Sequence, residues 1–184
     1  MAQTRLLTAE DLVGLPHDYE LYEGVSRGVA AAPDVSAIAA NVTAKLWNHV
    51  DEHRLGVVFG ADASFRLSRN PDVVYLPDAA FVRDERVRTD EDLEYPFEGA
   101  PDLAVEVRSP GDSAAELDRK MRTYLRTGTL LGWAIDPISR TVTVYEPGKP
   151  LVVLRDSDTL DGGAVLPGLR IGIRRVLRTR SRPR

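Results

Sequence analysis

The segment from residue 99 to residue 136 constrains the fold of this chain most, because it reads as a strand, a helix and a strand in succession. In residues 103–107, three aliphatic residues alternate with Ala104 and Glu106, the period-two pattern of a β-strand. A helix is expected from about Ser113 to Thr127, closed by Gly128, and residues 130–135 again favour a strand. This order predicts a sheet with a helix packed against it.

The remaining sequence adds a second long helix and several short strands. Asp34 is expected to cap a helix that runs to about His53, and a shorter helix follows Thr8 and ends at Pro16. Strands are expected at 19–22, 25–31, 57–67, 73–82 (interrupted by Pro77) and 141–145, with an exposed loop at 83–99. The prediction is a mixed α/β sheet flanked by helices in one domain, residues 1–177, followed by a basic, flexible tail, residues 178–184.

Composition excludes several classes of protein. The 184 residues are 43% hydrophobic and 28% charged, as in ordinary globular domains, and contain no cysteine, so disulfides and thiolate metal sites are excluded. No stretch approaches the roughly 18 apolar residues of a membrane span, and the first residues lack a signal-peptide core. These features favour a cytoplasmic protein that does not bind membranes.

The charge is unevenly distributed along the chain. The net charge is −4, although residues 170–184 contain seven arginines and no acidic residue. An acidic body suits a carboxylate site that recruits divalent cations. The basic tail is either a solvated terminus or a phosphate contact, and only the second would make nucleic-acid binding depend on it and on salt.

Glu106 is the first candidate for chemistry, because it is an acid within an apolar strand. Taken alone, this strand favours an exposed face, where a glutamate costs nothing. Asp78 changes the balance, since it is likewise the one acid in the apolar run 75–82. Two inward carboxylates from neighbouring strands would suit a hard divalent cation, whereas Asp102 lies about 13 Å along the same strand from Glu106, too far to share one ion.

Lys120 is the third candidate, on the helix that follows. An exposed i,i+4 pair with Glu116 would explain it at about 0.3–0.5 kcal/mol. Alternatively Lys120 turns toward the sheet, beside Tyr124, where it could orient the attacking water or bind the phosphate. Arg108 shares the face of Glu106 and could stabilise charge, but a guanidinium cannot serve as a general base.

Six motifs follow one another along nearly the whole chain. They are Tyr19-Glu20-Leu21-Tyr22-Glu23-Gly24, Leu76-Pro77-Asp78, Ala100-Pro101-Asp102-Leu103-Ala104-Val105-Glu106-Val107, Lys120-Met121-Arg122-Thr123-Tyr124, Trp133-Ala134-Ile135-Asp136-Pro137 and Leu166-Pro167-Gly168-Leu169. No single motif is specific on its own. In this order and spacing they resemble the Uma-two family of bacterial endonucleases in the PD-(D/E)XK nuclease superfamily.

The resemblance implies a restriction-endonuclease-like core and a nuclease site. Asp78 and Glu106 would be the metal ligands for Mg²⁺, with Mn²⁺ as a substitute, and the superfamily's lysine would have moved to the helix as Lys120. Glu20 would assist the metal or its water. Arg108, Glu116 and Tyr124 are accessory candidates. The implied substrate is nucleic acid, and DNA is favoured because the superfamily mostly acts on DNA.

Departures from the family pattern keep a second hypothesis open. They lie at Ser36-Ala37, Arg108 and Leu131-Gly132, and they leave the metal ligands intact while altering the substrate-facing groove. The alternative is a catalytically inactive module that binds nucleic acid or protein. A homodimer would suit double-strand cleavage, although no residue argues for one.

Two further patterns point elsewhere. His49 and His53 have the i,i+4 spacing of a zinc pair on a helix, but no third ligand lies nearby in sequence. Trp47 and Trp133 lie within apolar patterns and are interpreted as core residues rather than as platforms for stacked bases.

Overall fold

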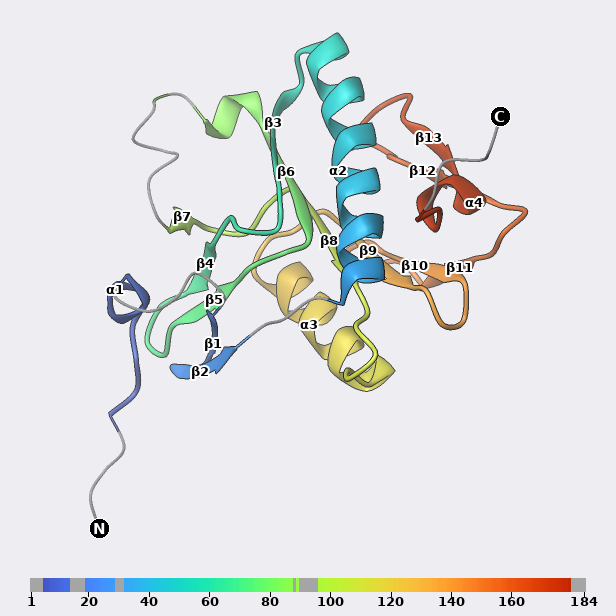
Figure 1. Ribbon diagram of the computed structural model, residues 1–184. Helices are drawn as coiled ribbons and strands as arrows, with labels where there is room; N and C mark the ends of the chain where they lie inside the picture. The colour runs from blue at the N-terminus through green and yellow to red at the C-terminus, as the bar shows by residue number, and fades with distance from the viewer. Residues whose placement is uncertain (1–4, 14–18, 29–31, 88, 90–95, 180–184) are drawn as a thin grey trace.

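The computed structural model describes residues 5–13, 19–28, 32–87, 89 and 96–179, and shows two sheets that share one α/β framework (Figure 1). The larger, six-stranded sheet has the order β11-β10-β9-β8-β6-β3. Its strands are β3 (Gly56–Phe59), β6 (Ala79–Arg83), β8 (Leu103–Val107), β9 (Leu131–Asp136), β10 (Thr141–Tyr145) and β11 (Val152–Leu154).

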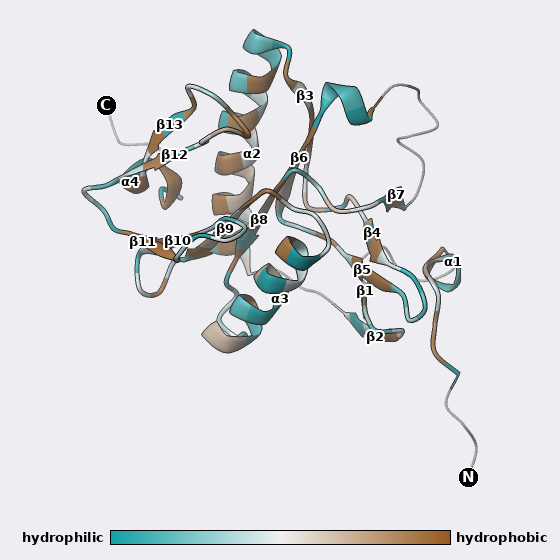
Figure 2. Ribbon diagram, turned by 180° about the vertical axis from the view of Figure 1, so that it is seen from behind, coloured by the Kyte–Doolittle hydropathy of each residue, from teal (hydrophilic) through white to brown (hydrophobic). Residues whose placement is uncertain are grey.

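Two helices cover opposite faces of this sheet. Helix α2 (Pro33–His53) packs with Leu103, Val105 and Val107 of β8, whereas α3 (Ala114–Arg126) packs with Ala104 on the other face. Helix α3 is the crossover between β8 and β9, which pair in parallel. Figure 2 shows apolar residues along β6 and α2 and mainly polar residues on the outer side of α3.

The smaller, five-stranded sheet has the order β2-β1-β5-β4-β7 and lies beside the first. Short elements complete the chain. The strands of this smaller sheet are β1 (Tyr19–Tyr22), β2 (Val25–Gly28), β4 (Phe65–Ser68), β5 (Val73–Tyr75) and β7 (Phe97–Glu98). The elements outside both sheets are α1 (Ala9–Leu12), the 3₁₀ helix η1 (Asp84–Arg86), the two-stranded pair β12 (Thr159–Asp161) and β13 (Arg170–Gly172), and α4 (Ile173–Val176).

The predicted mixed α/β sheet flanked by helices is confirmed, and most of its elements lie where the periodicity placed them. Three expectations were wrong. Residues 57–67 are two strands rather than one, β3 in the larger sheet and β4 in the smaller one, whereas the interruption expected at Pro77 is confirmed and separates β5 from β6. The expected loop at 83–99 contains η1 and β7. Helix α2 is capped at Ala32, with Asp34 in its first turn, where a negative side chain favours the helix dipole.

Other expectations fall partly on residues that the structure does not describe: Pro16 at the end of the first helix, residues 29–31 of the second strand, and residues 180–184 of the basic tail. The boundary between domain and tail at residue 177 therefore stays a prediction. Among the described helices, none combines the length and apolar character needed to cross a membrane.

Candidate nuclease site

Lys120 lies at the centre of a buried polar cluster between the two sheets. Its Nζ is 2.7 Å from Oε1 of Glu20 and 2.8 Å from Oε1 and Oε2 of Glu106. The Lys120 side chain is only 12% exposed. An exposed pair with Glu116 therefore does not describe this lysine; instead it joins a strand of each sheet.

Glu106 owes its position to the alternation along β8. The aliphatic residues of β8 face α2, so Glu106 faces α3 together with Ala104. Helix α3 covers that face, and Tyr124, one turn after Lys120, donates a hydrogen bond from its hydroxyl to Glu106 Oε1 at 2.9 Å. Glu106 is 6% exposed, so the alternative of a solvated strand face is wrong.

Glu20 enters the cluster from the smaller sheet and is fully buried. Strand alternation places Tyr22 on the same face as Glu20, and its hydroxyl donates to Glu20 Oε2 at 2.7 Å. The backbone N–H of Leu76 donates to Glu20 Oε1 at 2.8 Å. These donors satisfy a carboxylate that would otherwise be costly to bury.

Asp78 lies where the chain passes from β5 in the smaller sheet to β6 in the larger one. Its Oδ2 accepts the N–H of Val107 at 2.6 Å, next to Glu106. Ala79 pairs with Val105, so the antiparallel register, continued by one residue, places Asp78 opposite Glu106. Directly opposed residues have Cβ atoms roughly 4.5–5.5 Å apart. Asp78 also belongs to the lining of a pocket beside α2.

The carboxyl groups of Glu20 and Glu106 thus contact one ammonium group, and Asp78 is held beside Glu106 through the Val107 N–H, so acidic groups outnumber cations in the cluster. Burial raises the pKa of Glu106 to about 8; the Lys120 ammonium opposes that rise, and the Asp78 and Glu20 carboxylates add to it. Burial likewise raises the pKa of Asp78. Although burial disfavours its charge, Glu106 and Glu20 hold the pKa of Lys120 well above its usual value. The cluster therefore favours an additional positive charge.

Comparison with known proteins identifies the family of this chain. The sequence profile of the Uma2 family, described as "Putative restriction endonuclease", matches residues 9–175. The chain belongs to the Uma2 family. This is the Uma-two family that the motifs indicated.

One solved structure with the same fold is a crystal structure from Anabaena variabilis ATCC 29413, described as "a putative nuclease belonging to DUF820". It superposes with a TM-score of 0.80 at 23% sequence identity, over 93% of this chain and 97% of that one. At this identity the likeness establishes the fold. No protein with a curated description matches the Uma2 chain.

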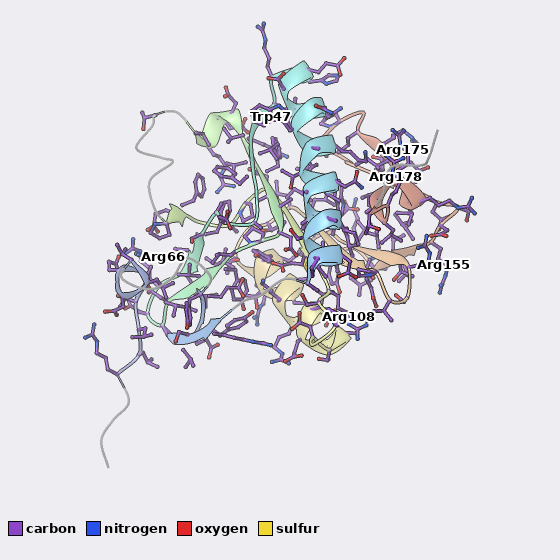
Figure 3. All side chains as sticks on the ribbon, viewed as in Figure 1. Trp47, Arg66, Arg108, Arg155, Arg175 and Arg178 are labelled. Atoms are coloured by element: carbon purple, nitrogen blue, oxygen red, sulfur yellow. The ribbon has the colours of Figure 1, made fainter. Side chains whose placement is uncertain are left out.

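The accessory candidates of the Uma2 chain divide into two groups. Tyr124 lies in the cluster, whereas Glu116 lies at the start of α3, where its carboxylate accepts the N–H of Ser113 at 2.9 Å and forms the helix cap. Arg108 follows the last residue of β8 and forms an ion pair with Asp136 at 2.9 Å. In Figure 3 it is labelled close to α3. The ion pair of Arg108 and the helix cap of Glu116 are structural roles, and neither involves contact with a substrate.

The rival acid Asp102 lies away from the cluster, as the strand spacing predicted. It accepts the N–H of Arg83 at 3.0 Å and pairs with the guanidinium of Arg86 at 3.0 Å. Asp102 therefore anchors the turn after β6 at the opposite end of β8. Asp78 stays the predicted partner with which Glu106 would share an ion.

The donor set fits a divalent cation that uses two protein carboxylates. Within the described residues, no group of three His, Asp or Glu side chains is arranged to hold an ion by itself. Mg²⁺ sites commonly have one or two carboxylates, with water and substrate phosphate completing the shell. Asp78 and Glu106 supply such a pair, and the surplus negative charge of the cluster fits a cation there.

Sequence reasoning missed two tyrosines and misplaced a tryptophan. Tyr22 was detectable, because it shares a strand face with Glu20; Tyr75, whose ring centroid lies 5.3 Å from Lys120 Nζ, carried no such signal. Trp133 is a buried core residue as predicted, but the same prediction for Trp47 was wrong, since Trp47 is 55% exposed.

Among the residues that the structure describes, no third ligand joins the histidine pair to complete a zinc site. The two rings stack with centroids 4.3 Å apart, and His53 Nδ1 lies 2.8 Å from the carbonyl oxygen of His49. His49 Nε2 lies 3.1 Å from the carbonyl oxygen of Pro167. The first two contacts lie within α2, and the third joins α2 to the C-terminal segment.

Proposed function

We propose that this Uma2 protein is a cytoplasmic, Mg²⁺-dependent endonuclease that hydrolyses phosphodiester bonds of nucleic acid, with DNA as the first substrate to test. Mn²⁺ is expected to replace Mg²⁺. The observation that carries the proposal is the buried cluster of Glu20, Asp78, Glu106 and Lys120, in which carboxylates outnumber cations. Homodimer formation stays a prediction without structural support.

Asp78 and Glu106 are the residues that would hold the cation. A bound divalent ion would neutralise charge on the phosphate and lower the pKa of its water far below the bulk value of about 15.7. The Val107 N–H fixes the Asp78 carboxylate by holding Oδ2. Tyr124 fixes Glu106 in the same way through Oε1. Both ligands are thus oriented before substrate arrives.

Lys120 would act as a positive charge and a hydrogen-bond donor rather than as a base. Its raised pKa keeps it protonated at neutral pH, because Glu106 and Glu20 both stabilise the ammonium. From this position it can donate to a phosphate oxygen or orient the attacking water. Glu20, held by Tyr22 and the Leu76 N–H, is a positioning residue for Lys120.

The test is nicking of supercoiled plasmid with and without Mg²⁺ or Mn²⁺. Wild type is expected to nick only with metal, and Asp78→Ala and Glu106→Gln are expected to lose at least about 100-fold, because losing a ligand should cost at least as much as the roughly 10–100-fold for losing a residue that orients one. Asp102→Asn is the matched control, a buried acid next to the same strand but outside the cluster, and should retain activity in the fraction that is folded.

Metal affinity separates this proposal from the inactive-module hypothesis. Titration calorimetry with Mn²⁺ should show binding by wild type that Asp78→Ala weakens. If metal adds no nicking and Asp78→Ala changes neither Mn²⁺ affinity nor thermal stability, the enzyme proposal is wrong and a non-catalytic binding module is the better description.

A further inference from the structure

A pocket of about 470 Å³ runs along α2 and reaches the candidate site. This size lies within the roughly 300–1,000 Å³ of small-molecule pockets. Asp78 belongs to both the pocket and the buried cluster, so a group bound in the pocket would lie beside the proposed reaction centre. The lining residues are Ser36, Ala39, Ala40, Thr43, Ala44 and Trp47 of α2, with Gly60, Ala61 and Asp78.

The wall of the pocket combines small residues with one large aromatic ring. Ala39, Ala40 and Ala44 line it along about one and a half turns of α2, and their small side chains leave an apolar surface next to the helix backbone. From Ser36 to Trp47 the helix rises about 16 Å. At about 3.4 Å per stacked nucleotide, that length accommodates more than one nucleotide of a strand.

Trp47 is the residue of this wall that packing does not explain. The other large apolar residues of α2, such as Ile38 and Leu46, are fully buried, whereas the indole of Trp47 is 55% exposed. Figure 3 shows Trp47 on the β3 side of α2, away from Arg175 and Arg178 on the other side of the helix. An indole exposed in a pocket offers a flat face for stacking.

We propose that this pocket receives an unpaired nucleobase of the substrate strand, stacked on Trp47, while the adjoining phosphate lies at Asp78. The proposal rests on the proposed nuclease function and specifies its substrate as single-stranded or locally unpaired nucleic acid. A base has a π-face that stacks on tryptophan whatever its sequence. In a duplex both faces of each base are already stacked, so the base must leave the stack to enter such a pocket.

The first experiment measures binding without cleavage. An oligothymidylate is titrated into Asp78→Asn protein in chelator at fixed salt, and tryptophan emission is recorded. Trp133 is fully buried, so quenching by a stacked base reports on Trp47. The affinity is compared with that for the same strand in a duplex, since fixed salt keeps the phosphate contribution comparable.

Three substitutions in that background locate the base. Trp47→Ala is expected to weaken single-strand binding about 5- to 150-fold, the range for loss of one stacked base, and Trp47→Phe should recover most of it, followed by fluorescence anisotropy of a labelled strand. Ala40→Leu fills the exposed lining of the pocket and should weaken binding while Trp47 is retained. Asn48→Leu, an exposed position of α2 outside the lining, is the matched control and should bind normally.

The outcomes separate this proposal from the nuclease proposal. Trp47-dependent single-strand binding, with no cleavage by wild type in any metal, would support the pocket while refuting the enzyme. Metal-dependent nicking combined with equal affinity for both strand forms, or with an unaltered affinity in Trp47→Ala, would overturn the pocket and leave the enzyme standing. Binding that Ala40→Leu does not change would also overturn it.

Discussion

Replacing Lys120 by methionine tests the buried cluster without needing substrate. Methionine keeps the length of the side chain and is a good helix former, so α3 itself should be unaffected. The substitution removes the ammonium that lies 2.7 Å from Glu20 and 2.8 Å from Glu106. Two buried carboxylates are then left without their cation.

The expected cost is about 3–5 kcal/mol of unfolding free energy at about pH 8, the range for removing one partner of a buried ion pair. The cost should be smaller below about pH 7 than at about pH 8.5, because below its folded pKa of about 8 Glu106 binds a proton and loses its unpaired charge. Urea unfolding followed by circular dichroism from about pH 5 to about pH 8.5 measures both effects.

Lys149→Met is the matched control for this measurement. Lys149 also pairs with a glutamate, Glu146, at 2.6 Å, but its side chain is 64% exposed. A surface pair of this kind contributes about 0–1 kcal/mol. If Lys120→Met costs no more than Lys149→Met at pH 8, Lys120 does not compensate buried charge and the assignment of the cluster is refuted.

The raised pKa of Glu106 and the packing around Gly56 can each be tested by one substitution. Glu106 has a pKa of about 8 in the folded state and about 4.5 in the unfolded state, so between these pH values the folded state binds more protons and the contribution of Glu106 to stability falls as pH rises. Glu106→Gln should therefore flatten the dependence of the unfolding free energy on pH. Parallel pH profiles for the two proteins would contradict the shift. At Gly56, with φ +146°, an added Cβ would lie 2.2 Å from the Val82 carbonyl oxygen, so Gly56→Ala should lower the free energy of unfolding by about 3 kcal/mol or more, measured by thermal unfolding. Gly148→Ala is the control, since the space around Gly148 is open, and it should cost about 1 kcal/mol. Equal losses in the two variants would contradict the clash.

The sequence predicted the elements that local periodicity determines. Strand β8 occupies residues 103–107 as expected, and α3 starts after Ser113, whose hydroxyl accepts the Glu116 N–H at 3.1 Å. The β9–β10 pair was also predicted. In each case neighbouring residues carry the signal, through alternation, helix spacing or a cap, and no distant contact is needed.

Burial of the acids could not be predicted in the same way. Alternation shows that Glu106 faces away from Val105, but it does not show whether that face meets water or a helix. Only the packing of α3 decides this, and it brings Tyr124 and Lys120 onto the carboxylate. The family resemblance supplied what periodicity lacked, by placing Lys120 and Glu20 in one site.

Trp47 shows how far the burial of a helix residue can be predicted from its sequence pattern. It follows Leu46, a fully buried residue, so its neighbours give it an apolar context. Successive side chains on a helix differ in direction by about 100°, so Trp47 faces the pocket although Leu46 faces the core. An amphipathic pattern with small residues on one flank leaves this edge ambiguous, because alanine occurs on buried and exposed faces alike.

The short linker Leu76-Pro77-Asp78 explains why the site depends on both sheets. The chain leaves the smaller sheet at Tyr75 and enters the larger one at Ala79, so Leu76 and Asp78 face different partners only two residues apart. The Leu76 N–H binds Glu20 in one sheet, and the Asp78 carboxylate binds the Val107 N–H in the other. Proline fixes φ between them and has no backbone N–H that would need a hydrogen-bond acceptor. Any change in how the sheets meet would therefore move Asp78 and Glu20 together, which couples the proposed metal ligand to the residue that positions Lys120.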